Sequence, residues 1–440
     1  MRERGILAAM LLVLAARPSV GQDAPALMLT LEDAQARASQ ESHRLAEVQA
    51  RESAAQAAVL AREAARRPLV SATAGYTRTN HVVEFTVPGP TGVPRVLYPD
   101  VPDNYHTRLD LQWPIYTGGR TDALERAARA EAAALAGEVA VARADLRLEV
   151  ARAYWAVVTA RSAAVVLEQG VARARAHVAD ARQRFDAGLV PPNEIASAEA
   201  QESRARMLLI EARNQRDVAS ADLARLVGAD LARPIDPASS LDDRAPLPGS
   251  LESLVLDARA SRAERTMLER RVDAAEEQHA AAAAGRQPVV SLGGGVDYAR
   301  PNGRIFPRVD RWEDSWDLGV NVTWSLWDGG RTSAEVAQAG SLTLAARRRL
   351  AEFDTVLAVE VRQRALEIDS GRAVVSAAAD GVRAATEAHR VVTERYRAGV
   401  IAQTEVLDAE FARLQAELDR TRALAAVRLA EARLARAVGR

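Results

Sequence analysis

Residues 113–120 read WPIYTGGR, and residues 324–331 read WSLWDGGR. The two stretches share a tryptophan, an apolar residue two positions later and a Gly-Gly-Arg ending, and their numbering differs by a constant offset (324 − 113 = 211). In each, alternating apolar residues indicate a strand that meets a turn, and a long run without proline follows. The sequence therefore predicts an internal duplication in which each copy passes from a strand into a long helix.

Further matched segments extend this duplication over most of the chain. TLED at Thr30 matches SLES at Ser250, and RRPLVS with Pro68 matches GRQPVVS with Pro288, both at a larger offset (250 − 30 = 288 − 68 = 220). The closing LARLVG and LARAVG, which end at Gly228 and Gly439, keep the smaller offset (439 − 228 = 211). The shortening of the offset (220 − 211 = 9) predicts a longer loop in the first strand hairpin.

Each copy is expected to run as helix, strand hairpin, long helix, turn and return helix. The first copy covers 22–228, a proline-rich and acidic linker covers 229–250, and the second copy covers 251–440. The predicted elements are first helices from 31 to 67 and after 251, hairpins over 68–116 and 288–327, long helices over 121–186 and 332–397, and return helices over 191–227 and 403–438. Each long helix would measure about 99 Å at 1.5 Å per residue.

Residues 1–21 have the pattern of a secretory signal peptide. Arg2 and Arg4 precede an apolar run over 5–16, and Ser19 and Gly21 supply small residues for cleavage. The run is too short to cross a bilayer, which takes about 20 residues, and no later uncharged stretch reaches that length. The mature chain is therefore expected to be exported without a transmembrane helix.

Composition excludes several classes of protein. The formal net charge is −1 and every basic residue is an arginine, so no basic surface for nucleic acid is indicated. The chain has no cysteine, which excludes disulfides, thiolate metal sites and acylation of an amino-terminal cysteine. Only 4% of residues are aromatic, and the abundance of good helix formers favours long helices.

Alternation in the predicted strands separates an apolar face from a polar face. Trp316, Val320 and Trp324 point one way, whereas Asp317 and Asn321 point the other. A soluble sandwich could show the same alternation. However, the spacing from Trp316 to Trp324 is about 26 Å in a strand, which matches the ~25 Å apolar band between the aromatic girdles of membrane barrels. The residues predicted to face lipid are Leu109, Leu111, Trp113, Trp316, Leu318, Val320, Val322 and Trp324.

Four strands are too few for a membrane barrel, because the smallest known have about eight. An open sheet edge would leave backbone donors and acceptors unpaired in hydrocarbon. The predicted fold is therefore mainly α with four strands per protomer that contribute to an oligomeric β-barrel. Two copies would give eight strands and three would give twelve, and ring symmetry allows either.

Nothing in the sequence favours an enzyme, a cofactor or a metal site. The six histidines are scattered without an HExxH motif, and each is interpreted as a surface or lumen residue. The turns at Gly118 and Gly329 lack the lysine of a phosphate-binding loop, so chain reversal is the better interpretation. A soluble periplasmic coiled-coil adaptor or structural protein remains the alternative. The strands with one apolar face, which are typical of a membrane barrel, argue against it.

Taken together, these motifs resemble the TolC-like outer-membrane factors of efflux pumps and type I secretion systems. The similarity covers nearly the whole mature chain. It lies in LTLEDA at Leu29, the two strand starts with proline, WPIYTGGR and WSLWDGGR, the turns RFDAGLVPPNEI and RYRAGVIAQTEVLDA, and the closing LARLVG and LARAVG. The resemblance implies a homotrimer in outer-membrane lipid, with a twelve-stranded barrel continued by a long antiparallel α-helical periplasmic tunnel. It also implies two partners, a periplasmic membrane-fusion adaptor and an inner-membrane transporter of RND, ABC or MFS type.

The resemblance further assigns roles to residues at the helix turns. It implies adaptor docking at the tips through Arg184, Phe185, Gly188, Leu189, Arg395, Tyr396, Gly399 and Val400. It implies a periplasmic constriction formed by Glu405, Asp408, Glu194 and Tyr396. Ile401 stands where the family commonly has an arginine, so half of the contact around Tyr396 is expected to be missing. Simple helix-end packing of Tyr396, and stabilisation of the helix dipole by Glu405 and Asp408, are the structural alternatives.

Overall fold

The computed structural model describes residues 26–90, 92–231, 233–243 and 249–440. The predicted signal peptide lies outside these residues. The chain forms two compact units, the first comprising the described residues of Met1–Ser42, Leu146–Ala245 and Ile368–Ala432, and the second comprising those of His43–Asp145, Pro246–Glu367 and Arg433–Arg440. Each unit takes segments from both sequence copies, so the compact units do not coincide with the copies.

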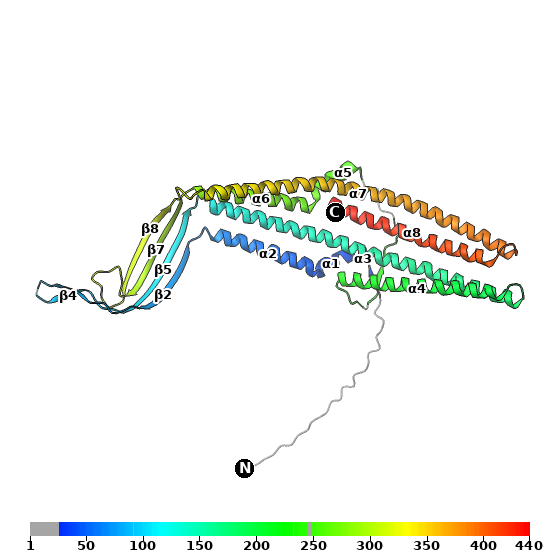
Figure 1. Cartoon of the computed structure of the whole chain (residues 1–440), viewed down its shortest axis with the longest axis horizontal. Helices are drawn as coiled ribbons and strands as arrows, with labels where there is room; N and C mark the ends of the chain where they lie inside the picture. The colour runs from blue at the N-terminus through cyan, green and yellow to red at the C-terminus, as the bar shows by residue number, and fades with distance from the viewer. Residues whose placement is uncertain (1–25, 91, 232, 244–248) are drawn as a thin grey trace, which may run out of the picture. The chain divides into compact units, whose positions relative to one another are not determined.

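The second unit contains a four-stranded antiparallel sheet. Its strands are β2 (Leu69–Arg78), β5 (Asp103–Tyr116), β7 (Val289–Arg300) and β8 (Glu313–Thr323). They lie in the order β2-β5-β7-β8, which Figure 1 shows. Each sequence copy therefore supplies one hairpin, and the pairing of β5 with β7 joins the two hairpins. The outer strands β2 and β8 are the two edges of the sheet.

The loops of the two hairpins differ in length, in the direction that the shortened repeat offset predicts. The loop from β2 to β5 spans 79–102, and it contains the small hairpin of β3 (Phe85–Pro88) and β4 (Pro94–Tyr98). The loop from β7 to β8 spans only 301–312. The first hairpin therefore carries the longer loop.

The last strand ends earlier than the sequence predicts. β8 ends at Thr323, which pairs with Val289, so Trp324 would lie opposite Pro288. Proline has no N–H with which to continue the ladder. The indole N–H of Trp324 instead donates to the backbone carbonyl of Arg286 at 3.1 Å. The predicted end of this hairpin at residue 327 is therefore wrong, and Trp324 lies beyond the strand.

The first helix of each copy is broken, which corrects the single helix predicted over 31–67. The helices are α1 (Leu31–Glu41) and α2 (His43–Ala64) in the first copy, and α5 (Leu251–Ser261) and α6 (Ala263–Ala283), followed by the 3-10 turn η1 (Ala284–Arg286), in the second. Ser42 and Arg262 separate them at equivalent positions of the two copies (262 − 42 = 220), with extended backbone at ψ 109° and 116°. Neither residue is a glycine or a proline, so no local signal in the sequence marks the break.

Tertiary hydrogen bonds hold the break in the second copy. The side chain of Arg262 is 7% exposed. Its guanidinium donates to the backbone carbonyl of Arg436 at 2.8 Å, to Glu264 at 2.9 Å and to Glu360 at 3.1 Å. A buried guanidinium needs such partners, because an unpaired buried charge is costly. The break therefore depends on residues far away in the chain.

Part of the linker between the copies is ordered in the first unit. Residues Ile235–Pro237 form β6, which pairs in parallel with β1 (Leu27–Leu29). The fully buried Tyr154 braces this pair, because its hydroxyl donates to the backbone carbonyl of Leu29 at 3.1 Å and accepts from the backbone N–H of Ser239 at 3.1 Å. The start of the first copy and the linker are thus tied together.

Four helices carry most of the remaining chain. They are α3 (Arg120–Asp186), α4 (Pro192–Leu226), α7 (Arg331–Arg397) and α8 (Gln403–Val438). α3 and α7 have 67 residues each, about 100 Å at 1.5 Å per residue. In the first unit, Leu167 and Val171 of α3 pack with Leu209 of α4 and Leu414 of α8 in one apolar cluster. Among the described residues, only α3 is long and apolar enough to match a membrane span, and half of its most apolar window is buried, as in a core helix.

Candidate functional site

One face of the sheet is apolar across its strands. Cross-strand partners share a face of a sheet, and the pairing places seven of the eight predicted apolar residues on one face, whereas Trp324 lies beyond the end of β8. The rows are Leu109–Val296–Trp316, Leu111–Gly294–Leu318, Trp113–Leu292–Val320 and Val290–Val322. No layer of the described residues covers these side chains: Trp316 is 71% exposed and Val320 is 64% exposed. A contiguous apolar face of this size marks an interaction surface and not an ordinary solvent face.

The opposite face of the same sheet is charged. Arg108 lies at its centre, with Nε 2.6 Å from a carboxylate oxygen of Asp110 and Nη1 3.0 Å from a carboxylate oxygen of Asp317. The same guanidinium forms an ion pair with Asp297 on the neighbouring strand. Arg304 adds a second cation to Asp317 at 2.9 Å. The sheet thus separates two chemically opposite surfaces, as a wall between lipid and water requires.

The two turns between long and return helices have the same backbone motif. Gly188 and Gly399 have φ of 72° and 75°, a left-handed conformation that favours glycine. The N–H of Leu189 donates to the carbonyl of Arg184, and the N–H of Val400 donates to that of Arg395. These six-to-one hydrogen bonds close a Schellman motif at each helix end. Leu189 and Val400 are left 73% and 64% exposed, so each turn presents an apolar side chain to its surroundings.

Next to these turns, side chains of both hairpins meet in the first unit. The hydroxyl of Tyr396 donates to Glu194 at 3.3 Å, and burial, followed by the charge of Glu194, raises the pKa of the Tyr396 phenol. The guanidinium of Arg184 lies 4.4 Å from the centre of the Tyr396 ring. With its amide oriented so that the nitrogen faces Glu194, Gln403 donates to both the carboxylate and the carbonyl of Glu194, each at 3.2 Å. Tyr396 itself is 8% exposed.

The sequence did not predict the part of this contact that Arg184 and Gln403 supply. Ile401 indeed supplies no arginine, but Arg184 of the other hairpin reaches the Tyr396 ring, and Gln403 takes a place beside Glu194. A cation–π contact of this kind leaves no sequence signature, because the two partners come from different copies of the repeat. Glu405 and Asp408 are exposed on α8, one helical turn apart, outside this buried contact.

The interpretation of all six histidines as scattered residues also requires correction. His177 of α3 and His389 of α7 lie in edge contact, with ring centres 6.4 Å apart, and Glu410 of α8 approaches them. The separation of the two histidines along the chain (389 − 177 = 212) exceeds the later repeat offset by one. They are therefore not equivalent positions of the two copies, and no spacing in the sequence predicts their meeting.

Comparison with known proteins assigns this fold to a family. Residues 35–229 and 254–440 match the family described as "Outer membrane efflux protein". The outer membrane efflux protein BepC of Brucella suis is 27% identical over 259 residues, which is 59% of this chain and 55% of that protein. The aligned region thus spans about half the length of this relative.

Solved structures share the fold over most of the chain. The outer membrane protein VceC of Vibrio cholerae is 21% identical with a TM-score of 0.77, covering 93% of this chain and 96% of that one. The MtrE outer membrane channel of Neisseria gonorrhoeae is 20% identical with a TM-score of 0.76, covering 93% and 88%. The CmeC outer membrane channel of Campylobacter jejuni is 16% identical with a TM-score of 0.77, covering 93% and 85%.

The chain therefore belongs to the outer membrane efflux protein family, whose members are outer-membrane channels and not enzymes. The resemblance to TolC-like factors is confirmed, and so is the outer-membrane location. The alternative of a soluble periplasmic adaptor is disfavoured.

The turn geometry predicts opposite effects for two glycine substitutions in α7 and its turn. Gly399→Ala places a side chain at φ 75° and should cost about 1 kcal/mol, whereas Gly381→Ala lies inside α7, where a Cβ meets no atom within 4 Å, and should stabilise the helix by up to about 1 kcal/mol. Thermal unfolding of the purified protein in detergent, followed by circular dichroism, measures both. A higher unfolding midpoint for Gly399→Ala would contradict the left-handed turn.

Proposed function

We propose that this chain is one subunit of a homotrimeric outer-membrane channel that serves as the passive exit duct of an efflux or type I secretion system. Three copies of its sheet would close a barrel of twelve strands (3 × 4). The observation that carries the proposal is the four-stranded sheet with one apolar and one charged face and with open edges at β2 and β8. Such a sheet can stand in lipid only when other copies pair with its edges.

The number three comes from the family and not from the strands alone. Two copies would also close a ring, with eight strands. The TolC-like resemblance favours three. In this arrangement the apolar rows of β5, β7 and β8 meet lipid, and the face with Arg108 and its aspartates lines the lumen. A polar lumen inside an apolar outer wall is the general plan of membrane barrels that conduct.

The helices would continue this duct into the periplasm. α3 and α7 supply the long walls, and α4 and α8 return from the turns at Gly188 and Gly399. Movement of substrate along such a duct needs no chemistry from the chain, which fits a family without enzymes. Energy would come from an inner-membrane transporter of RND, ABC or MFS type.

The turns are the proposed docking points for a periplasmic membrane-fusion adaptor. The contact set is Arg184, Phe185, Gly188, Leu189, Arg395, Tyr396, Gly399 and Val400. Support comes from the exposure of Leu189 and Val400 and from Phe185, which is 41% exposed. An exposed apolar side chain on a rigid, hydrogen-bonded turn is a suitable anchor for a partner because it needs little ordering on binding.

The contact of Tyr396 with Glu194 and Arg184 would hold the two helical hairpins of one protomer together in the resting state. The contact is polar and partly buried. It therefore stabilises one arrangement of the two hairpins and does not require a large buried apolar area. Glu405 and Asp408, exposed on the same side of α8, would form the acidic rings of the periplasmic constriction when three copies assemble. Rings of carboxylates attract cations.

Arginine substitutions in β8 test the proposed membrane wall. Val320 lies midway between Trp316 and Trp324, so Val320→Arg should destabilise the barrel by about 2 to 4 kcal/mol. Asn321→Arg introduces the same charge one residue away on the opposite face and should be tolerated with altered conductance. The fraction of trimer in mild detergent and the conductance in planar bilayers measure the two effects. Equal tolerance of both substitutions would remove the basis for the lipid-facing assignment.

Neutralisation of Glu405 and Asp408 tests the proposed constriction. The double variant Glu405→Gln, Asp408→Asn should fold and assemble as a trimer, but multivalent cations added on the periplasmic side should block it less, because the rings lose their charge. The control exchanges the two acids, Glu405→Asp with Asp408→Glu, and should keep the block. If neutralisation leaves the block unchanged, these side chains only stabilise the helix dipole, at about 0.3 to 1 kcal/mol each.

A further inference from the structure

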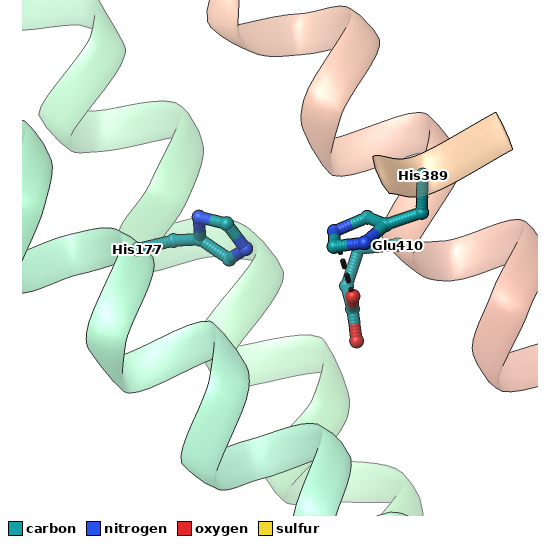
Figure 2. Close-up of side chains that lie close together, drawn as sticks. All are labelled: His177, His389 and Glu410. Atoms are coloured by element: carbon teal, nitrogen blue, oxygen red, sulfur yellow. Dashed lines mark ion pairs between the residues drawn. The ribbon is translucent and has the colours of Figure 1, made fainter. Parts of the chain in front are cut away.

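Three side chains that could bind a metal ion converge inside the first unit. His177 comes from α3, His389 from α7 and Glu410 from α8, and one ligand atom of each lies within 4.8 Å of those of the other two. Figure 2 shows the two imidazoles turned toward one another, with the carboxylate of Glu410 beside His389. Nε2 of His389 is 3.1 Å from Oε2 of Glu410.

The carboxylate in this cluster is buried and only half satisfied. The side chain of Glu410 is 7% exposed, and its Oε1 accepts from Nε of Arg173. Its Oε2 and Nε2 of His389 are both buried and lie 3.1 Å apart, but neither atom makes a hydrogen bond among the described residues. Buried polar atoms without partners are rare, because each costs the desolvation of that atom. A cation bound by both atoms would satisfy them together.

A divalent transition-metal ion fits this set of ligands. Two imidazoles and one carboxylate are a common three-ligand set for zinc, with water in the fourth position. Ligand bonds of about 2.0 to 2.1 Å in a tetrahedron put neighbouring ligand atoms about 3.3 Å apart, close to the 3.1 Å between His389 and Glu410. The ligand atom of His177 lies within 4.8 Å of the other two, so it would have to approach by at most about 1.5 Å (4.8 − 3.3).

The charges around the cluster also bear on which ion binds. Arg173 pairs with Glu410 and lies 3.3 Å from Glu417, and Arg413 pairs with Glu417 at 3.1 Å. The charges of these two arginines and two glutamates nearly cancel. The net charge around the cluster therefore attracts calcium or magnesium only weakly. Burial lowers the pKa of His389, the charge of Glu410 opposes this shift, and the nearby arginines and His177 act in the same direction as burial. Neutral imidazole is a good ligand for zinc, copper and nickel.

We propose that His177, His389 and Glu410 form a binding site for one divalent transition-metal ion of the zinc class per chain. The ion would link α3 to α7 and α8 within the first unit. Because it binds only when these helices are in contact, it stabilises that contact by mass action. The site uses none of the residues of the proposed constriction or of the docking turns, so it stands independently of the proposed channel function.

Cobalt binding tests the site directly. The full mature chain, purified in detergent without a polyhistidine tag and treated with a chelator, is titrated with Co²⁺, and isothermal titration calorimetry and the visible spectrum are recorded. We expect one Co²⁺ per chain with the intense visible absorption of four-coordinate cobalt. Zn²⁺ should displace it and raise the thermal unfolding midpoint, whereas Mg²⁺ should do neither.

Substitutions in the cluster and outside it distinguish this site from unspecific binding. His177→Asn, His389→Asn and Glu410→Gln should each weaken Co²⁺ binding by more than the roughly tenfold loss that follows removal of an outer-shell partner. His43→Asn removes an exposed histidine of α2 and should leave binding unchanged. His177→Asn keeps the pair of Arg173 with Glu410, so it remains informative if Glu410→Gln fails to fold. No saturable Co²⁺ binding to the folded parent chain, or equal binding by the His177 and His43 variants, would overturn the proposal.

Discussion

A backbone amide in hydrocarbon has no water to bond, and this constraint governs the rest of the structure. In the described residues the four strands pair with one another, whereas β2 and β8 each have one edge without a partner strand. One face of the sheet is apolar, so water is an unfavourable surrounding for it. Lipid is unfavourable for a single chain, because the backbone groups at the open edges would have no hydrogen-bond partners there. The proposed assembly with further copies would satisfy both conditions. Duplication within the chain supplies two hairpins, and under this proposal the other copies supply the rest.

The helical part obeys a different balance of interactions. In the first unit, α3, α4 and α8 share an apolar cluster. The hydrophobic effect that stabilises this cluster is not directional. Near the turns the contacts between the hairpins are instead polar and specific. Tyr396 meets Glu194 and Arg184, and Glu410 meets Arg173 and His389. Polar contacts of this kind select one arrangement of helices and can be broken at lower cost than an apolar core. Such contacts would suit the proposed docking of an adaptor at these turns.

Patterns with a short period could be predicted from the sequence, and contacts between distant residues could not. Alternation along β5 and β8 indicated the apolar face correctly, because the side-chain period of a strand is two and the register of the sheet preserves it. The ends of the long helices at 186 and 397 were predicted as well, and left-handed glycines at 188 and 399 follow them. The break at Arg262 was not visible, because its cause is a set of hydrogen bonds to Glu264, Glu360 and the carbonyl of Arg436. The meeting of His177 with His389 depends in the same way on packing between helices.

Accessibility along β8 in a lipid bilayer tests the central claim, that the two faces of the sheet meet different solvents. The chain has no cysteine, so single cysteines at each position from 316 to 323 can carry a spin label without a background signal. Labels at Trp316, Leu318, Val320 and Val322 should be reached by oxygen dissolved in lipid, and labels at the intervening positions by a water-soluble nickel complex, with a period of two residues. Uniform access of the water-soluble complex to every one of these positions would contradict the claim.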